Sequence, residues 1–210
     1  MSGLLDLLSS PMGKQLISGV ADQTGNSTDQ TGSVLTMALP LLMGAMKKNA
    51  STPEGAQGLM SALSNKHDGS ILDNLGGLFG GGVDSSVKED GAGILGHVLG
   101  GKQAQVENAL SQKSGMDTGS IATILQVAAP ILMGMIGQQK QKQNVSDANG
   151  LQSLLGGMMG GGKQADKQQS LIESFLDSDG DGSILDDVAS LALGGKKGGI
   201  GGLLGGLFGK

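Results

Sequence analysis

The sequence has no cysteine, arginine, tryptophan or tyrosine, and its only aromatic residues are three phenylalanines in a chain of 210 residues. Without cysteine the chain can form no disulfide, no thiolate metal site and no cysteine nucleophile. All fourteen basic residues are lysine and the formal net charge is −5. Because guanidinium groups and stacking aromatics are what usually bind nucleic acid, we expect no nucleic-acid partner.

Glycine is abundant, with 40 residues. A core must therefore be built from leucine, isoleucine, valine, methionine and alanine, with the eleven methionines filling irregular gaps. So little aromatic bulk lets helices approach one another closely. The first residues, MSGLLDLLSSPMGKQ, have no basic segment before their short apolar patch, so they do not resemble a secretory signal. We expect a cytoplasmic protein, with signal-less export to the cell surface or outside as the alternative.

The chain repeats itself. The segment VLTMALPLLMGAM at 34–46 returns 90 residues later as ILQVAAPILMGMI at 124–136, with six of thirteen positions identical. The motif DGSILD occurs at 68–73 and again at 181–186. The order of apolar segment, acidic turn and glycine-rich tail is the same in both, which indicates a tandem duplication.

This pattern predicts an all-α fold, a tandem duplication of a small multihelical unit with a buried apolar central helix and Gly-rich tails. The first helical repeat spans 1–86 and the second 87–197, followed by a docking tail at 198–210. The second repeat contains a Gln/Gly-rich insertion at about 137–169, whose composition is typical of a mobile connector with a possible short helix at LQSLL.

The apolar segment at 118–139 is long enough to cross a membrane, with 22 uncharged residues. Its polar residues, and the shorter run of 17 residues at 30–46 in the first repeat, favour a buried helix of a soluble fold instead. Pro40 and Pro130 lie inside these segments, and each should kink its helix or break it in two.

The sequence DSDGDGSILDD at 177–187 resembles a calcium loop. Asp177, Asp179 and Asp181 stand at loop positions 1, 3 and 5, and Ser183 at position 7 offers its backbone carbonyl. The twelfth position is Val188 rather than glutamate, so we expect the loop to close on Asp186 or Asp187, or to bind one calcium ion weakly. The alternative is that these aspartates only cap a helix and solvate a turn.

The first DGSILD tests this interpretation. Ser64, Lys66 and Asp68 stand where the second repeat has its three aspartates, and a lysine among the ligands makes calcium improbable there. We expect Asp68 or Ser70 to cap a helix beginning near Ile71, with Ile71 and Leu72 packed inward.

Catalytic chemistry has little support. His67 and His97 are the only histidines and neither has an acid and a nucleophile at a recognisable spacing. The stretch GGGK at 160–163 lacks the spacing of a phosphate-binding loop. We therefore expect no enzyme and no small-molecule substrate.

The pattern ILGHVLGGKQAQVENALSQKSG, the apolar helix with its proline and the tail GGIGGLLGGLFG together resemble the YidB-like family of uncharacterised bacterial proteins, domain of unknown function 937, in two tandem copies. The resemblance implies a bacterial source and a small multihelical fold. It carries no catalytic residues.

We expect a structural, self-assembling protein that forms a homo-oligomer or filament. The repeated GGLFG, at 76–80 and 205–209, alternates glycine with apolar residues and suits a docking tail. Its C-terminal contacts would be Ile200, Leu203, Leu204, Leu207 and Phe208. The alternatives are a membrane- or envelope-associated protein, with lipid contact through these segments, and a calcium-responsive binding module.

Overall fold

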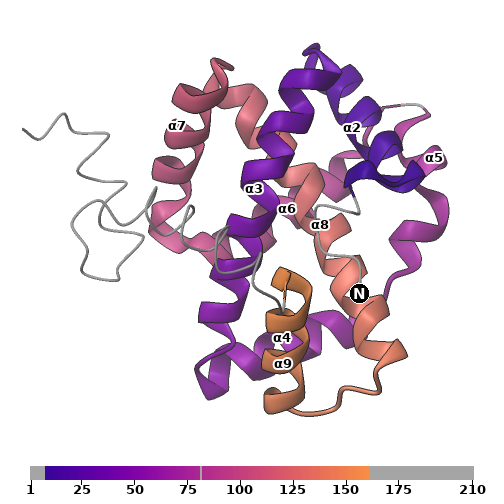
Figure 1. Ribbon diagram of the computed structural model, residues 1–210, viewed down its shortest axis with the longest axis vertical. Coiled ribbons are helices and arrows are strands. Elements are labelled where there is room, and N and C mark those ends of the chain that lie inside the picture. The colour runs from indigo at the N-terminus through magenta and orange to yellow at the C-terminus, as the bar shows by residue number, and fades with distance from the viewer. Residues whose placement is uncertain (1–7, 81, 161–210) are drawn as a thin grey trace, which may run out of the picture.

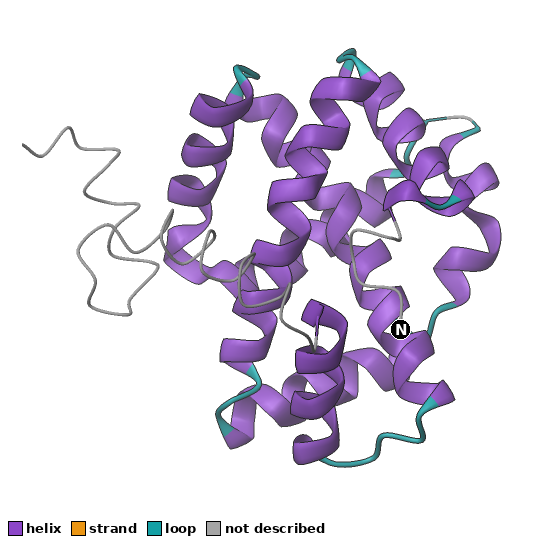
Figure 2. Ribbon diagram, viewed as in Figure 1, coloured by secondary structure: helices purple, strands orange, loops and turns teal. Residues whose placement is uncertain are grey.

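A computed structural model describes residues 8–80 and 82–160, and this part of the chain contains helices and no strand (Figure 2). The first half holds α2 (Pro11–Thr24), α3 (Thr28–Asn49), α4 (Pro53–Asn65), the 3-10 turn η1 (Ser70–Asn74) and α5 (Leu75–Phe79). The second half holds α6 (Ser85–Leu99), the turn η2 (Gly100–Lys102), α7 (Gln103–Ser114), α8 (Thr118–Lys142) and α9 (Ala148–Gly160).

Helix α8 is the centre of the fold. Its middle is apolar on every side, and every residue from Val127 to Gly134 is buried. Helices α2, α3, α4, α6, α7 and α9 all pack against it, and α6 does so most extensively (Figure 1). The predicted all-α fold with a buried apolar central helix is therefore confirmed.

Glycines let neighbouring backbones lie directly on α8. A Cβ atom at Gly91 of α6 would stand 1.8 Å from the carbonyl oxygen of Gln126. A Cβ at Gly137 of α8 would stand 1.8 Å from the carbonyl oxygen of His67. Any side chain at either position would force the two backbones apart, because real Cβ atoms do not approach so closely.

The two long apolar helices begin in the same way. Helices α2 and α7 both end at a left-handed glycine, Gly25 with φ 66° and Gly115 with φ 71°. The side chain of Ser27 then caps α3 by accepting from the backbone N–H of Gln30, and Asp117 caps α8 by accepting from Ser120. Each long helix thus starts from a tight turn with its first donors satisfied.

Neither proline divides its helix. Helix α3 runs through Pro40 and α8 runs through Pro130, so the break into two helices, one of the two outcomes expected there, is wrong. A proline removes one backbone hydrogen bond from a long helix. Packing on several sides of α3 and α8 stabilises each helix against that local loss.

The mobile connector expected at 137–169 is mostly helical in its described part, and the possible short helix at LQSLL is confirmed as part of α9. Residues up to Lys142 continue α8, and α9 follows from Ala148 to Gly160. Leu151, Leu154 and Leu155 of α9 are buried, at the spacing of one helix face. Lysine and glutamine are good helix formers, so their abundance did not indicate a loop. Residues 161–169 lie outside the described residues.

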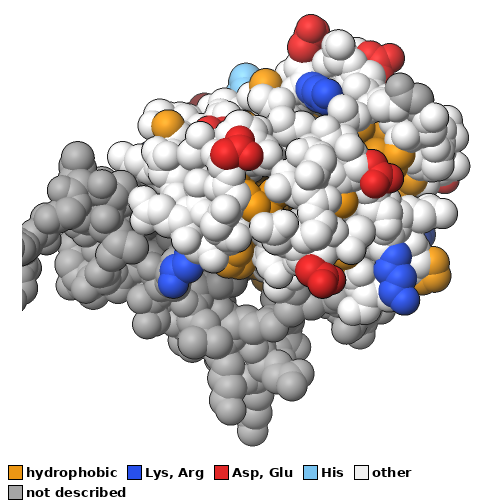
Figure 3. Space-filling model, turned by 90° about the horizontal axis from the view of Figure 1, so that it is seen from above, with side chains coloured by type: hydrophobic (Ala, Val, Ile, Leu, Met, Phe, Trp, Pro, Cys, Tyr) orange, Lys and Arg blue, Asp and Glu red, His pale blue; other side chains and the backbone are white. Residues whose placement is uncertain are grey.

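The two halves share one hydrophobic core. Buried residues of α2 and α3 belong to the same cluster as those of α6, α7, α8 and α9. The predicted boundary between 86 and 87 falls within the first turn of α6. On the face shown in Figure 3, acidic and basic side chains are interspersed and apolar side chains surface in small separate places.

Replacing Gly91 by alanine should destabilise the fold. The added methyl would meet the backbone of α8, and overpacking of this kind costs about 1–3 kcal/mol. Gly96 is the matched control, because it lies in the same helix with nothing within 4 Å of its Cβ position. Gly96→Ala should stabilise the protein by up to about 1 kcal/mol through helix propensity. Urea unfolding of both variants measures the difference, and equal free energies would contradict the close packing of α6 on α8.

Candidate interaction site

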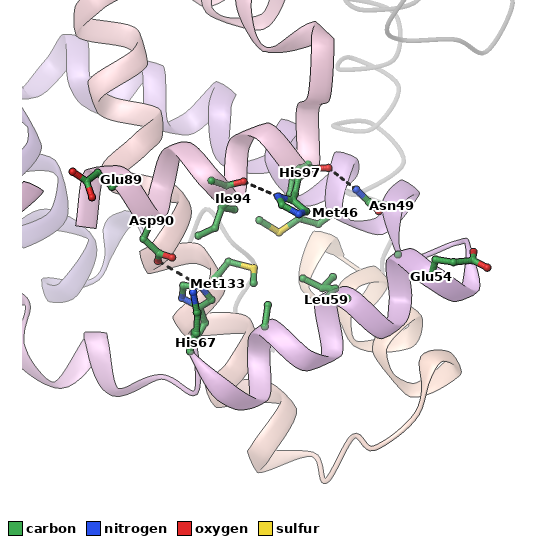
Figure 4. A pocket seen from close by; sticks show the side chains of 16 residues that line it. Met46, Asn49, Glu54, Leu59, His67, Glu89, Asp90, Ile94, His97 and Met133 are labelled. Carbon is green, nitrogen blue, oxygen red and sulfur yellow. Dashed lines mark hydrogen bonds and ion pairs between the residues drawn. The ribbon is translucent and has the colours of Figure 1, made fainter. Parts of the chain in front are cut away.

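A cleft of about 520 Å³ opens between α4 and α6. Met46 of α3 and Met133 of α8 line it, with Leu59 of α4 and Ile94 of α6 (Figure 4). Its charged lining residues are Glu54, Glu89, Asp90 and Lys66, so acidic groups outnumber basic ones. Its apolar lining and acidic groups suit a ligand with an apolar body and a positive charge.

Both histidines line this cleft. His67 lies at one end, where its Nε2 is 3.5 Å from Oδ2 of Asp90, and only 6% of the residue is exposed (Figure 4). His97 lies at the other end, with Nδ1 3.1 Å from the carbonyl oxygen of Gly93. Asn49 donates a 2.8 Å hydrogen bond to the carbonyl oxygen of His97, which ties α3 to α6.

Burial lowers the pKa of His67, and this effect outweighs the opposing attraction of Asp90. Lys66 lowers the pKa further, whereas Asp68 raises it. The residues lining the cleft include no serine, threonine or tyrosine. Among the described residues, no group of three or more His, Cys, Asp or Glu is placed to hold a metal ion. The geometry of the cleft thus offers binding contacts and one buried imidazole.

The turn between α4 and η1 packs on α8 next to the cleft. The Asp68 carboxylate accepts a 3.0 Å hydrogen bond from the Ser70 backbone N–H, which lowers the Asp68 pKa. Gln141 donates a 3.1 Å hydrogen bond to the Asp68 carbonyl oxygen. Leu72 is buried and Ile71 is half-buried, so the inward packing predicted for the first DGSILD is confirmed. The N-cap of η1 is Gly69, which has no side chain to cap the helix, so Asp68 holds the turn through Ser70 instead of capping a helix.

The first GGLFG segment docks within its own chain. Residues 75–79 form α5, which packs against α2. The ring of Phe79 lies against Gly19, where a Cβ atom would be only 2.2 Å from Cγ of the ring. A glycine in α2 therefore provides the notch that receives this phenylalanine.

The other predicted site residues lie outside the described residues. These are the calcium ligands Asp177, Asp179, Asp181, Ser183, Asp186 and Asp187, and the assembly residues Ile200, Leu203, Leu204, Leu207 and Phe208. Both remain predictions. Sequence reasoning missed the shared cleft of His67 and His97, because these residues are 30 positions apart and no spacing rule joins a turn after α4 to a face of α6.

The comparisons with known proteins give one family. The model of the family described as "Bacterial protein of unknown function (DUF937)" matches residues 6–139 and 141–210. The chain belongs to the DUF937 family. No curated protein and no solved structure matches the chain. The resemblance to this family is confirmed over nearly the whole chain, and its description assigns no activity.

Helix α8 has the length and hydropathy of a membrane span, with a mean hydropathy of 1.8 in its most apolar window. In the fold, 67% of that window is buried against other helices. Burial on this scale is typical of the central helix of a globular core. The sequence favoured the same interpretation for the segment at 118–139.

The free energy of unfolding should fall as the pH drops from about 7 to 5. The unfolded chain has His67 near its ordinary pKa of 6.5, so it takes up a proton that the folded chain, with a lowered pKa, resists. His67→Gln should remove this part of the pH dependence. His97→Gln is the control, because His97 is exposed, and it should leave the dependence in place. Urea titrations at several pH values test this, and an unchanged slope in His67→Gln would refute it.

Proposed function

We propose that this DUF937 protein is a non-enzymatic structural protein that assembles into oligomers or filaments through its C-terminal tail at 198–210. The observation that carries the proposal is the docking of α5 on α2 by Phe79. It supports the idea that LGGLFG is a segment that buries itself against a helix. A second copy of this segment stands at Leu204 to Gly209.

The notch used by the first segment is not available to the second. Gly19 is covered by the chain's own Phe79. In the sequence alignment of α2 with α7, the residue that corresponds to Gly19 is Ala109, whose methyl group would fill the notch. Phe208 and its neighbours must therefore bind a different surface, and we propose that this surface lies on another copy.

The apolar content of the tail gives such a contact enough driving force. Ile200, Leu203, Leu204, Leu207 and Phe208 would each contribute about 1.5–3 kcal/mol on full burial, before the cost of ordering the tail. A tail that binds a different surface on the next copy makes a head-to-tail contact, which yields a ring or a filament.

Tandem duplication belongs to the same proposal. Its support is the matched construction of α2 with α3 and α7 with α8, including left-handed Gly25 and Gly115. Helix α4, which follows α3, packs against α8. In the same way α9, which follows α8, packs against α3. We further propose that the loop at 177–187 binds calcium and thereby rigidifies a turn whose first copy, at Asp68, folds without a ligand cluster.

Removing the apolar character of the tail should abolish assembly. In Leu204→Asp with Phe208→Asp, two buried contacts are lost and two charges are added, so the variant should sediment as a monomer where the full chain sediments as larger species. Sedimentation velocity over a range of concentrations, with calcium and with chelator, measures this.

Gln57→Asp with Gln112→Asp is the matched control, because both residues are exposed and the charge change is the same. This control should assemble like the unmodified chain. A monodisperse unmodified chain at high concentration, with and without calcium, would contradict the proposal. Flotation of the same variants with liposomes distinguishes assembly from lipid binding by the tail.

A further inference from the structure

One face of α3 is less covered than the matching face of α8. Val127, Ile131 and Gly134 of α8 are buried. The residues 90 positions earlier, Met37, Leu41 and Gly44, are only half-buried. Positions 37, 41 and 44 lie on one helix stripe, so the difference is a continuous apolar strip along α3.

On α8, the end of the matching strip, at Gly134, is covered by the first DGSILD. The Cγ2 atom of Ile71 lies so close to Gly134 that a Cβ there would be 2.5 Å away. The same motif occurs a second time in the chain, at 181–186, and Gly44 is the counterpart of Gly134. The covering segment and the surface that it covers are thus both present twice.

The charges of the two pairs differ in a complementary way. Beyond Gly134, α8 continues with Gly137 and Gln138, whereas α3 has the exposed lysines Lys47 and Lys48 at these positions. In the turns, Ser64 and Lys66 of the first copy correspond to Asp177 and Asp179 of the second. The second turn therefore has two aspartates in place of a serine and a lysine, so it is more acidic than the first. Both surfaces carry two lysines, because α8 has Lys140 and Lys142 in its last turn, and Lys140 donates a 3.1 Å hydrogen bond to Ser64 of the first turn. On α3 the two lysines stand closer to Gly44, where the more acidic second turn would meet them.

We propose that residues 181–186 dock on α3 of their own chain, with Ile184 over Gly44 and with Asp177 and Asp179 beside Lys47 and Lys48. This rests on the duplication included in the proposed function and is separate from assembly by the tail. The helices that precede the two motifs show the same pattern. Helix α4, before the first DGSILD, packs on α8, and α9, before the second DGSILD, packs on α3.

The connection is long enough. Residues 161–176, which are 16 residues, separate the end of α9 from Asp177, and an extended chain spans about 3.3 Å per residue. Met159, near the end of α9, already lies beside Gly44, so the distance to be spanned is short. Docking within one chain therefore requires no exchange between copies.

One contact must differ between the two sites. A Cβ at Gly137 would meet the carbonyl oxygen of His67, and Lys47 has a Cβ at the corresponding place. The second turn must therefore stand farther from its helix at that point. Gly180 replaces His67 in the second copy and gives the backbone the freedom to do so.

The absence of cysteine makes a cross-linking test direct. In the full chain with Gly44→Cys and Ile184→Cys, mild oxidation should form a disulfide within the chain, because the two Cα atoms would lie within the roughly 7 Å that a disulfide requires. A cysteine at residue 44 is tolerable, since its Cβ would be 3.9 Å from the nearest atom, Cε of Met159. Non-reducing electrophoresis and mass spectrometry in chelator measure the product.

Thr36→Cys with Ile184→Cys is the matched control, because Thr36 is exposed two turns earlier on α3 and should stay reduced. Lys47→Glu with Lys48→Glu should suppress the cross-link at residue 44, and adding Asp177→Lys with Asp179→Lys should restore it. A cross-link no more frequent than the control, or one formed only between chains, would overturn the docking. Neither result would affect assembly by the tail, which sedimentation velocity measures independently.

Discussion

The fold depends on backbones that lie directly on a helix with no polar side. At Gly91 and Gly137 a helix and a turn approach α8 so closely that not even a methyl group fits between them. A chain with three phenylalanines and no tryptophan or tyrosine has few large side chains to fill space between helices. Close approach through glycine replaces that bulk, because dispersion contacts are lost quickly as surfaces separate.

The same constraint gives the glycine-rich segments a structural meaning. Phe79 packs against Gly19, and Ile71 packs against Gly134, so in each place a short apolar segment lies on a helix at a glycine. A second DGSILD and a second GGLFG then become candidates for further contacts of this type, one on α3 and one on another copy. The proposed functions of the turn and the tail follow from contacts that their first copies make.

Much of the fold could be predicted from the sequence. The uncharged run at 118–139 indicated the central helix, and the repeat at 68–73 indicated a turn with Leu72 inward, although the side-chain cap expected there is absent. The continuity of α3 through Pro40 and of α8 through Pro130 was not predictable in this way, since the packing that preserves each helix involves residues distant in the chain. The possible short helix at LQSLL was indicated, but the full extent of α9 was not, because Leu151, Leu154 and Leu155 stand among glycines and glutamines that are typical of linkers. The cleft with His67 and His97 depends on how α4 crosses α6, which no local pattern specifies.

Native-state hydrogen exchange tests the central role of α8 most directly. If the whole fold depends on the close covering of this helix, the amides from Val127 to Ile136 should exchange only by global unfolding, with a free energy equal to that from urea denaturation. Amides of α4, which lies at the edge of the cleft, should exchange through smaller openings. Exchange of the α8 amides at a lower free energy than those of α4 would contradict the account.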